Sequence, residues 1–143
     1  MPPHDIAKLW KSTIKVGNTE QPDDPFDLQA LNDTGANVTD CFHGRRPIHS
    51  GSVEEVRDAP NPGQKCYLIR LNHRPTVLSQ VQYRGVAMPA NDGQFHKIVG
   101  IRKTVFLGIP SQPVTDKKGI EDSKKELAAI LAQDEGTWTG TQP

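Results

Sequence analysis

The stretch that decides the fold class is residues 67–72, Tyr-Leu-Ile-Arg-Leu-Asn, in the middle of the chain. Its side chains alternate along an extended backbone. One face receives Tyr67, Ile69 and Leu71, and the other receives Leu68, Arg70 and Asn72. Such alternation is typical of a β-strand with one buried face, so we predict a strand whose apolar side lies in the core.

Similar segments lie on both sides of this stretch. Upstream, Val53–Arg57 is an extended segment that is closed by a turn-rich stretch at residues 58–63. Downstream, alternating segments occupy residues 77–83 and 95–109. Consecutive strands with short connections predict an antiparallel meander over residues 48–110.

The two ends of the chain have different patterns. Two short alternating segments around a turn-rich stretch predict an N-terminal β-hairpin within residues 6–31. After Pro110, apolar residues fall at helical spacing, which predicts an amphipathic helix at 115–134 and a loose tail at 135–143. We therefore expect residues 1–143 to form a single α+β domain.

The composition limits the possible partners. The 17 basic and 17 acidic residues balance, which excludes a strongly basic arm or an acidic tail. Any contact with RNA must therefore use a locally positive face. Hydrophobic residues make up only 34% of the chain, which predicts a thin core that is completed against a partner subunit.

Targeting signals and a disulfide framework are not expected. The longest apolar runs are a few residues, and the N-terminal segment lacks the pattern of a secretory signal. The short apolar runs predict no membrane contact. Cys41 and Cys66 are too few for a disulfide framework, so a reducing cytosol is predicted. Zinc is not predicted, because the spacing of these cysteines with His43 and His49 matches no compact zinc site. No cofactor is expected.

One short motif suggests catalysis. The string Asp33-Thr34-Gly35-Ala36 resembles the signature of retroviral-type aspartic proteases, in which two such carboxylates from a dimer share one proton. Here Asn32 precedes the motif where those enzymes have an apolar residue, and the chain ends in a predicted helix instead of a strand. A homodimeric aspartic protease that uses Asp33 is therefore kept as the alternative function, and no catalytic residue is assigned.

Polar side chains on the predicted outer face of the meander form a candidate surface for RNA. Arginine and small polar groups on a sheet face bind phosphates and unstacked bases. The candidate RNA-binding residues are Arg57, Arg70, Asn72, Arg102 and Thr104.

The order of these segments resembles the coat proteins of single-stranded RNA bacteriophages. Similar local strings are Arg46-Pro47-Ile48, residues 53–57 with the strand that follows, Gly85-Val86-Ala87-Met88-Pro89, and Leu107-Gly108-Ile109-Pro110. The resemblance implies an N-terminal hairpin, a five-stranded antiparallel sheet, and a C-terminal helix that packs across the sheet of a dimer partner. It also implies that Gly85, Val86, Met88 and Pro89 lie in a loop around the symmetry axes of the shell.

The implied function is that of a structural capsid protein without enzymatic activity. Homodimers would assemble into an icosahedral virion, or a virus-like particle, that packages single-stranded genomic RNA in the cytoplasm of a bacterial host. Dimerisation is physically reasonable, because a sheet with one apolar face and one short helix cannot cover itself, whereas two copies can. A small RNA-binding module that never assembles is a third possibility.

Overall fold

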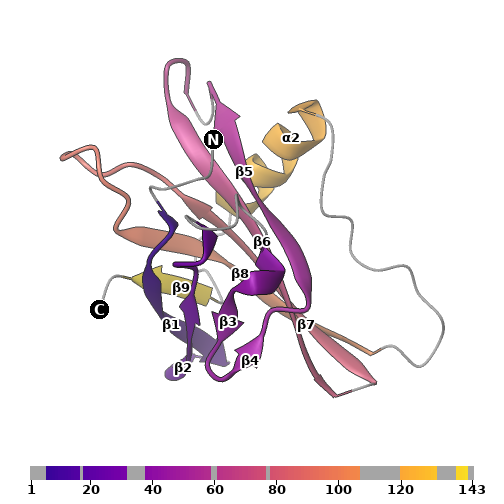
Figure 1. The fold of residues 1–143 in the computed structure, drawn as a ribbon. Coiled ribbons are helices and arrows are strands. Elements are labelled where there is room, and N and C mark those ends of the chain that lie inside the picture. The colour runs from indigo at the N-terminus through magenta and orange to yellow at the C-terminus, as the bar shows by residue number, and fades with distance from the viewer. Residues whose placement is uncertain are drawn as a thin grey trace.

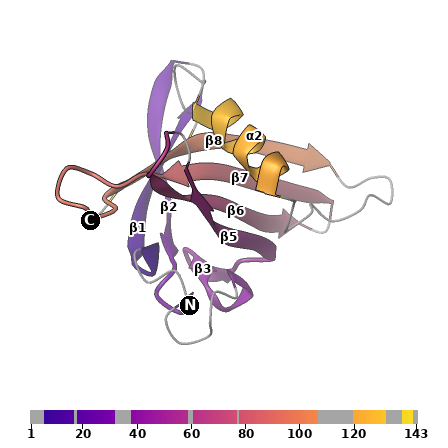
Figure 2. The same cartoon turned by 90° about the horizontal axis from the view of Figure 1, so that it is seen from above.

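The computed structural model describes residues 6–16, 18–31, 38–58, 61–76, 78–106, 120–131 and 138–141. In this part of the chain, nine antiparallel strands form one sheet that curls into a half-barrel, with helix α2 against it (Figures 1 and 2). The elements are β1 (Leu9–Val16), β2 (Thr19–Asp27), β3 (Phe42–His43), β4 (Arg46–Pro47), β5 (Ser50–Arg57), β6 (Lys65–Thr76), β7 (Ser79–Ala87), β8 (Lys97–Phe106), α2 (Ile120–Leu131) and β9 (Trp138–Thr141). The predicted five-stranded sheet with a C-terminal helix is therefore wrong.

Two predicted parts of the sheet are confirmed. The hairpin expected within residues 6–31 is β1 paired with β2, and the meander expected within 48–110 is β5 to β8, each strand antiparallel to the next. The strand count was wrong because β3 and β4 have two residues each and β9 has four. Strands this short have no visible period.

Strand β9 joins the N-terminal hairpin to the meander. The strand order is β4-β3-β2-β1-β9-β8-β7-β6-β5, so β9 lies between β1 and β8. Thr141 is paired with Lys11 on one side and with Lys97 on the other. The predicted loose tail is therefore wrong for residues 138–141, because Trp138 anchors them in the core with 1% of its surface exposed.

Both faces of the meander are covered by the chain itself. Strand β6 shows this best, because its residues from Cys66 to Asn72 are all buried. On one face, Tyr67, Ile69 and Leu71 belong to a large core with residues of β1, β2 and β9. On the other face, a smaller cluster joins the sheet to the helix. This cluster contains Val56, Cys66, Leu68, Val86, Leu127 and Ile130.

The helix therefore packs on its own sheet, and the predicted packing across the sheet of a dimer partner is wrong. Figure 2 shows α2 lying across the meander on the side away from β3. The strand pattern was interpreted as one apolar and one solvated face, whereas Leu68 and Val86 make the second face apolar enough to hold a helix. In the described part of the chain, α2 thus covers the second face of the sheet.

A glycine in β7 makes room for the indole of Trp138. A Cβ atom on Gly85 would lie 2.5 Å from Cζ3 of Trp138 and 2.6 Å from Cγ2 of Ile98. Real Cβ atoms do not approach other atoms so closely, so any side chain at position 85 would displace the indole. Gly85 therefore has a packing role that fixes β9 against the meander.

Candidate functional site

The predicted RNA-binding residues lie on two different faces of the sheet. Residues directly opposite each other on neighbouring strands point to the same face. Arg102 is opposite Tyr83, and Thr104 is opposite Val81, so both lie on the face that covers the large core. Arg70 and Asn72 lie on the helix face. The prediction that these residues share one face is therefore wrong. Strand β8 has apolar residues on both sides; the sequence predicts that the side of Val99 and Ile101 faces the core, whereas Val99 lies opposite Val86 on the helix face.

Arg70 is the centre of an ion cluster between the sheet and the helix. Its Nε donates a 2.8 Å hydrogen bond to Glu126 of α2, and its Nη1 lies 2.9 Å from the Ser52 hydroxyl and 3.2 Å from a carboxylate oxygen of Glu54. The Arg70 side chain is 1% exposed. Its charge is thus compensated by two carboxylates, and it is not accessible to RNA.

The other predicted residues differ in accessibility. Asn72 is buried, where its amide donates to the Ser50 hydroxyl at 2.8 Å and accepts a hydrogen bond from Arg84 at 2.9 Å. Arg57 and Thr104 are exposed, and Arg102 is half-buried with its Nε 3.2 Å from the Tyr83 hydroxyl. An RNA-binding role stays a prediction for these three, and burial excludes direct contact for Asn72.

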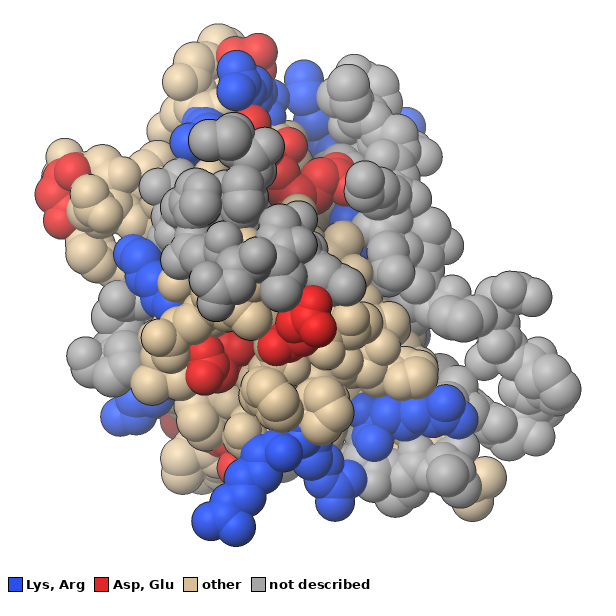
Figure 3. Space-filling view, in the orientation of Figure 1, with Lys and Arg blue, Asp and Glu red and all other residues tan. Residues whose placement is uncertain are grey.

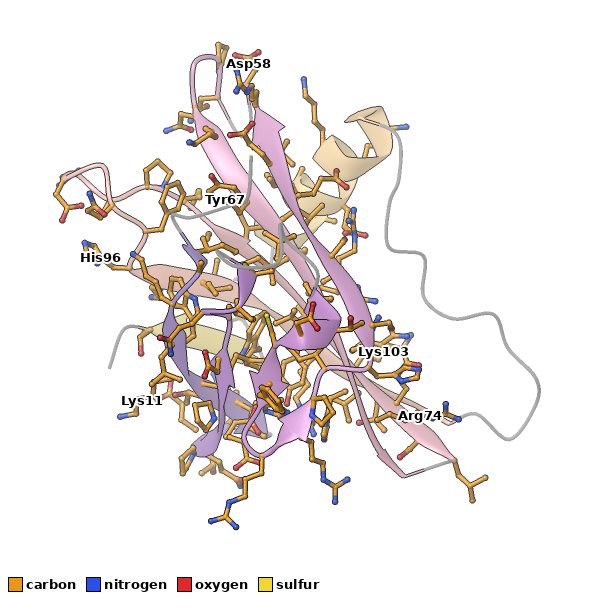
Figure 4. The ribbon with its side chains drawn as sticks, in the orientation of Figure 1. Lys11, Asp58, Tyr67, Arg74, His96 and Lys103 are labelled. Carbon is orange, nitrogen blue, oxygen red and sulfur yellow. The ribbon has the colours of Figure 1, made fainter. Side chains whose placement is uncertain are left out.

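The predicted symmetry-axis loop is divided between a strand and a connection. Gly85 and Val86 are buried within β7, whereas Met88 and Pro89 begin the connection to β8. Figure 4 places His96 at the end of this connection, next to the start of β8. The side chain of His96 lies 2.8 Å from Asp92, and this hydrogen bond lowers the pKa of that carboxyl. An exposed connection of this kind is accessible to another subunit.

A buried polar network around Asp23 was not predicted from the sequence. One carboxylate oxygen of Asp23 accepts hydrogen bonds from the hydroxyl of Tyr83 at 2.8 Å and from that of Ser12 at 3.0 Å, and Nε2 of His43 lies 3.2 Å from it. Ser12 in turn accepts a 2.8 Å hydrogen bond from the indole of Trp138. One carboxylate thus connects β1, β2, β3, β7 and β9. The sequence predicts that Asp23-Asp24 belongs to the turn-rich stretch of the hairpin, because two acidic residues between prolines are typical of a turn, whereas both residues lie in β2.

The network keeps Asp23 ionised. Burial raises the pKa of this carboxyl, but hydrogen bonds from His43, Tyr83 and Ser12 outweigh that effect and lower its pKa to about 2. Burial raises the pKa of the Tyr83 hydroxyl, and the nearby charge of Asp23 raises it further. The pair is therefore a carboxylate and a neutral phenol at neutral pH.

An open cavity of about 640 Å³ lies beside this network. Its walls include His43 and His73, with Arg45, Arg46 and Asp24 around them. The two imidazole rings are 4.8 Å apart, and the buried Nδ1 atom of each has no hydrogen-bond partner. Figure 3 shows long basic side chains along the lower edge of the molecule, below β3 and β4.

The chemistry of this cavity suits an anionic group. Burial lowers the pKa of His73, and the charges of His43 and Arg46 lower it further, so its ring is neutral at pH 7. A neutral imidazole ring in the wall of the cavity adds no charge of its own. Arginine adds charge and further donors in a geometry that matches a phosphate. The cavity is therefore a candidate site for a phosphate group.

Other candidate sites have less support. Cys41 and Cys66 are free and buried; burial, followed by the charges of Asp27 and Asp40, raises the pKa of the Cys41 thiol to about 11. Among the described residues, no group of three or more His, Cys, Asp or Glu side chains could hold a metal ion. Asp33 and its motif lie outside the described residues. No helix of the described segments has both the length and the apolar character needed to cross a membrane.

Comparison of the chain with models of protein families, with curated proteins and with solved structures gave no match.

Proposed function

We propose that this chain is a structural coat subunit of an RNA bacteriophage, which assembles with further copies of itself into an icosahedral shell around single-stranded RNA. The chain resembles these coat proteins in the order of its segments and in four local strings. The hairpin β1–β2, the meander β5–β8 and the exposed connection after Met88 are consistent with this resemblance. The helix is not exchanged between subunits, because α2 packs on the sheet of its own chain.

The observation that carries the proposal is the outer edge of β5, the last strand of the meander. In the described part of the chain, β5 is the last strand of the sheet and has eight residues, whereas the opposite edge strand, β4, has two and contains Pro47. A long edge strand presents free backbone donors and acceptors to other chains. A subunit with such an edge is suited to continue its sheet into a neighbour.

The cavity beside β3 and β4 supports the RNA part of the proposal. It combines Arg45 and Arg46 with the imidazole rings of His43 and His73 in its wall. One such site binds a phosphodiester weakly. Many copies in a shell add many weak contacts, which is how a chain without net charge can retain RNA.

Particle imaging tests the proposal. We expect the purified protein to form large particles in negative-stain electron microscopy, with an absorbance ratio that shows packaged RNA. The variant with both Arg45→Ala and Arg46→Ala should form particles with less RNA, because the cavity loses two charges. Lys11→Ala, which removes an exposed charge from β1, is the control and should keep the RNA content. Only species of one or two chains would overturn the coat function; particles of the double variant with unchanged RNA would overturn the role of the cavity.

A further inference from the structure

We infer that the C-terminal half of β5 pairs with the same segment of a second copy, antiparallel and about a two-fold axis at Val56. This inference deepens the proposed coat function, because it names the contact by which one subunit continues the sheet of the next. It also holds for a simple dimer, so the two proposals can fail separately.

The backbone of β5 identifies the groups that are free. Residues Ser50 to Arg57 pair with β6 in an unbroken register, and the next residue, Asp58, donates its N–H to the carbonyl of Gln64 at 2.7 Å. In an antiparallel ladder the backbone groups point alternately to one side and the other. Because Asp58 points toward β6, Arg57, Glu55 and Val53 direct their backbone groups away from the sheet.

The C-terminal half of β5 pairs with β6 on one side and lies far from the N-terminal strands. Figure 4 places Asp58 at the tip of the β5–β6 hairpin, at the opposite end of the molecule from β3 and β4. The side chain of Arg57 is 77% exposed, and that of Glu55 is 37% exposed. The two charged side chains at this edge are therefore accessible to a second chain.

The charges of β5 select the register. Glu55 and Arg57 lie on the same face, with Nε of Arg57 3.1 Å from a carboxylate oxygen of Glu55. Antiparallel pairing about Val56 places Glu55 opposite Arg57 of the second copy, and Arg57 opposite its Glu55. The backbone groups of both residues point outward, so these opposite positions are also hydrogen-bonded pairs. Pairing about Glu55 instead would bring two glutamates together, which is unfavourable.

Charged side chains on an edge strand commonly prevent pairing. Strand β5 differs because a two-fold axis at Val56 places the negative charge of each copy opposite the positive charge of the other. The paired segment is short, and Lys65 already lies 3.7 Å from Glu55, so a single contact is expected to be weak. Such contacts become effective when each subunit makes several of them.

Charge exchange at positions 55 and 57 tests the pairing. In Glu55→Arg alone, two arginines of one chain face two arginines of the other, and in Arg57→Glu alone four glutamates meet. We expect each variant to associate at least about tenfold more weakly than the natural chain in sedimentation velocity. An equimolar mixture of the two variants should regain association, because the positive edge of one matches the negative edge of the other. The doubly exchanged chain should regain it alone.

Controls separate pairing from folding and from assembly. Lys103→Glu reverses an exposed charge on β8 and should leave association unchanged, and circular dichroism should show that every variant is folded. Association of both single variants at the natural strength, or folded variants whose mixture stays dissociated, would overturn the pairing. Particles that form equally well from all variants would leave the coat function standing without this contact. Charge-dependent dimers that never form particles would support the pairing and overturn the coat function.

Discussion

The two faces of the meander are held by polar clusters of different kinds. On the helix face, Arg70 lies between the carboxylates of Glu54 and Glu126, so charge is compensated by charge. On the other face, the Asp23 carboxylate is stabilised by hydroxyl and imidazole donors from Ser12, Tyr83 and His43. The first cluster attaches one helix, whereas the second connects five strands. The face covered by β-strands should therefore contribute more to stability than the face covered by α2.

The largest expected effect is the loss of Trp138. Trp138→Ala should lower the free energy of unfolding by about 4 kcal/mol, because a fully buried indole and its hydrogen bond to Ser12 are lost. Leu127→Ala on the helix face should cost about 2–3 kcal/mol. Urea unfolding of both variants compares the two faces. A smaller loss for Trp138→Ala than for Leu127→Ala would contradict the greater contribution of the strand-covered face.

The second effect concerns the ion cluster. Arg70→Ala should destabilise the protein by about 3 kcal/mol, because two carboxylates are left without their buried partner. Arg57→Ala removes an exposed arginine that also has a glutamate partner, and should change stability by less than about 0.5 kcal/mol. Thermal unfolding gives both values. Equal losses would show that the Arg70 cluster contributes little to holding the helix.

The smallest expected effect appears in acid. Because the folded pKa of Asp23 is about 2 against an ordinary value of 3.8, its ionisation stabilises the fold above about pH 4. This contribution of about 2 kcal/mol should be lost as the pH falls from 4 to 2. In Asp23→Asn, stability should start lower and show a shallower decline over this range. Glu20→Gln, at an exposed position of the same strand, is the control; a decline as steep in Asp23→Asn as in the natural chain would assign the acid sensitivity to other groups.

The candidate site was only partly predictable. The sequence identified Arg70 and Asn72 as notable polar residues on a strand, but it could not show that α2 and β5 supply their partners. Asp23 and His43 are 20 residues apart, and Tyr83 is 60 residues from Asp23, so no local spacing signals their hydrogen bonds. The residue pattern of a single strand does not show that its histidine pairs with an acidic residue of another strand.

The sequence by itself determined the local elements: the hairpin within residues 6–31, the four strands of the meander, and a helix within 115–134, of which residues 120–131 are described. Alternation and helical spacing are properties of residues that are close in the sequence, so they can be recognised without knowledge of the tertiary structure. Only the tertiary structure decided that β9 joins the two parts of the sheet and that α2 covers the chain's own second face. These arrangements depend on contacts between residues far apart in the chain, such as Trp138 with Ser12. The free energy of such contacts cannot be estimated from a local sequence pattern.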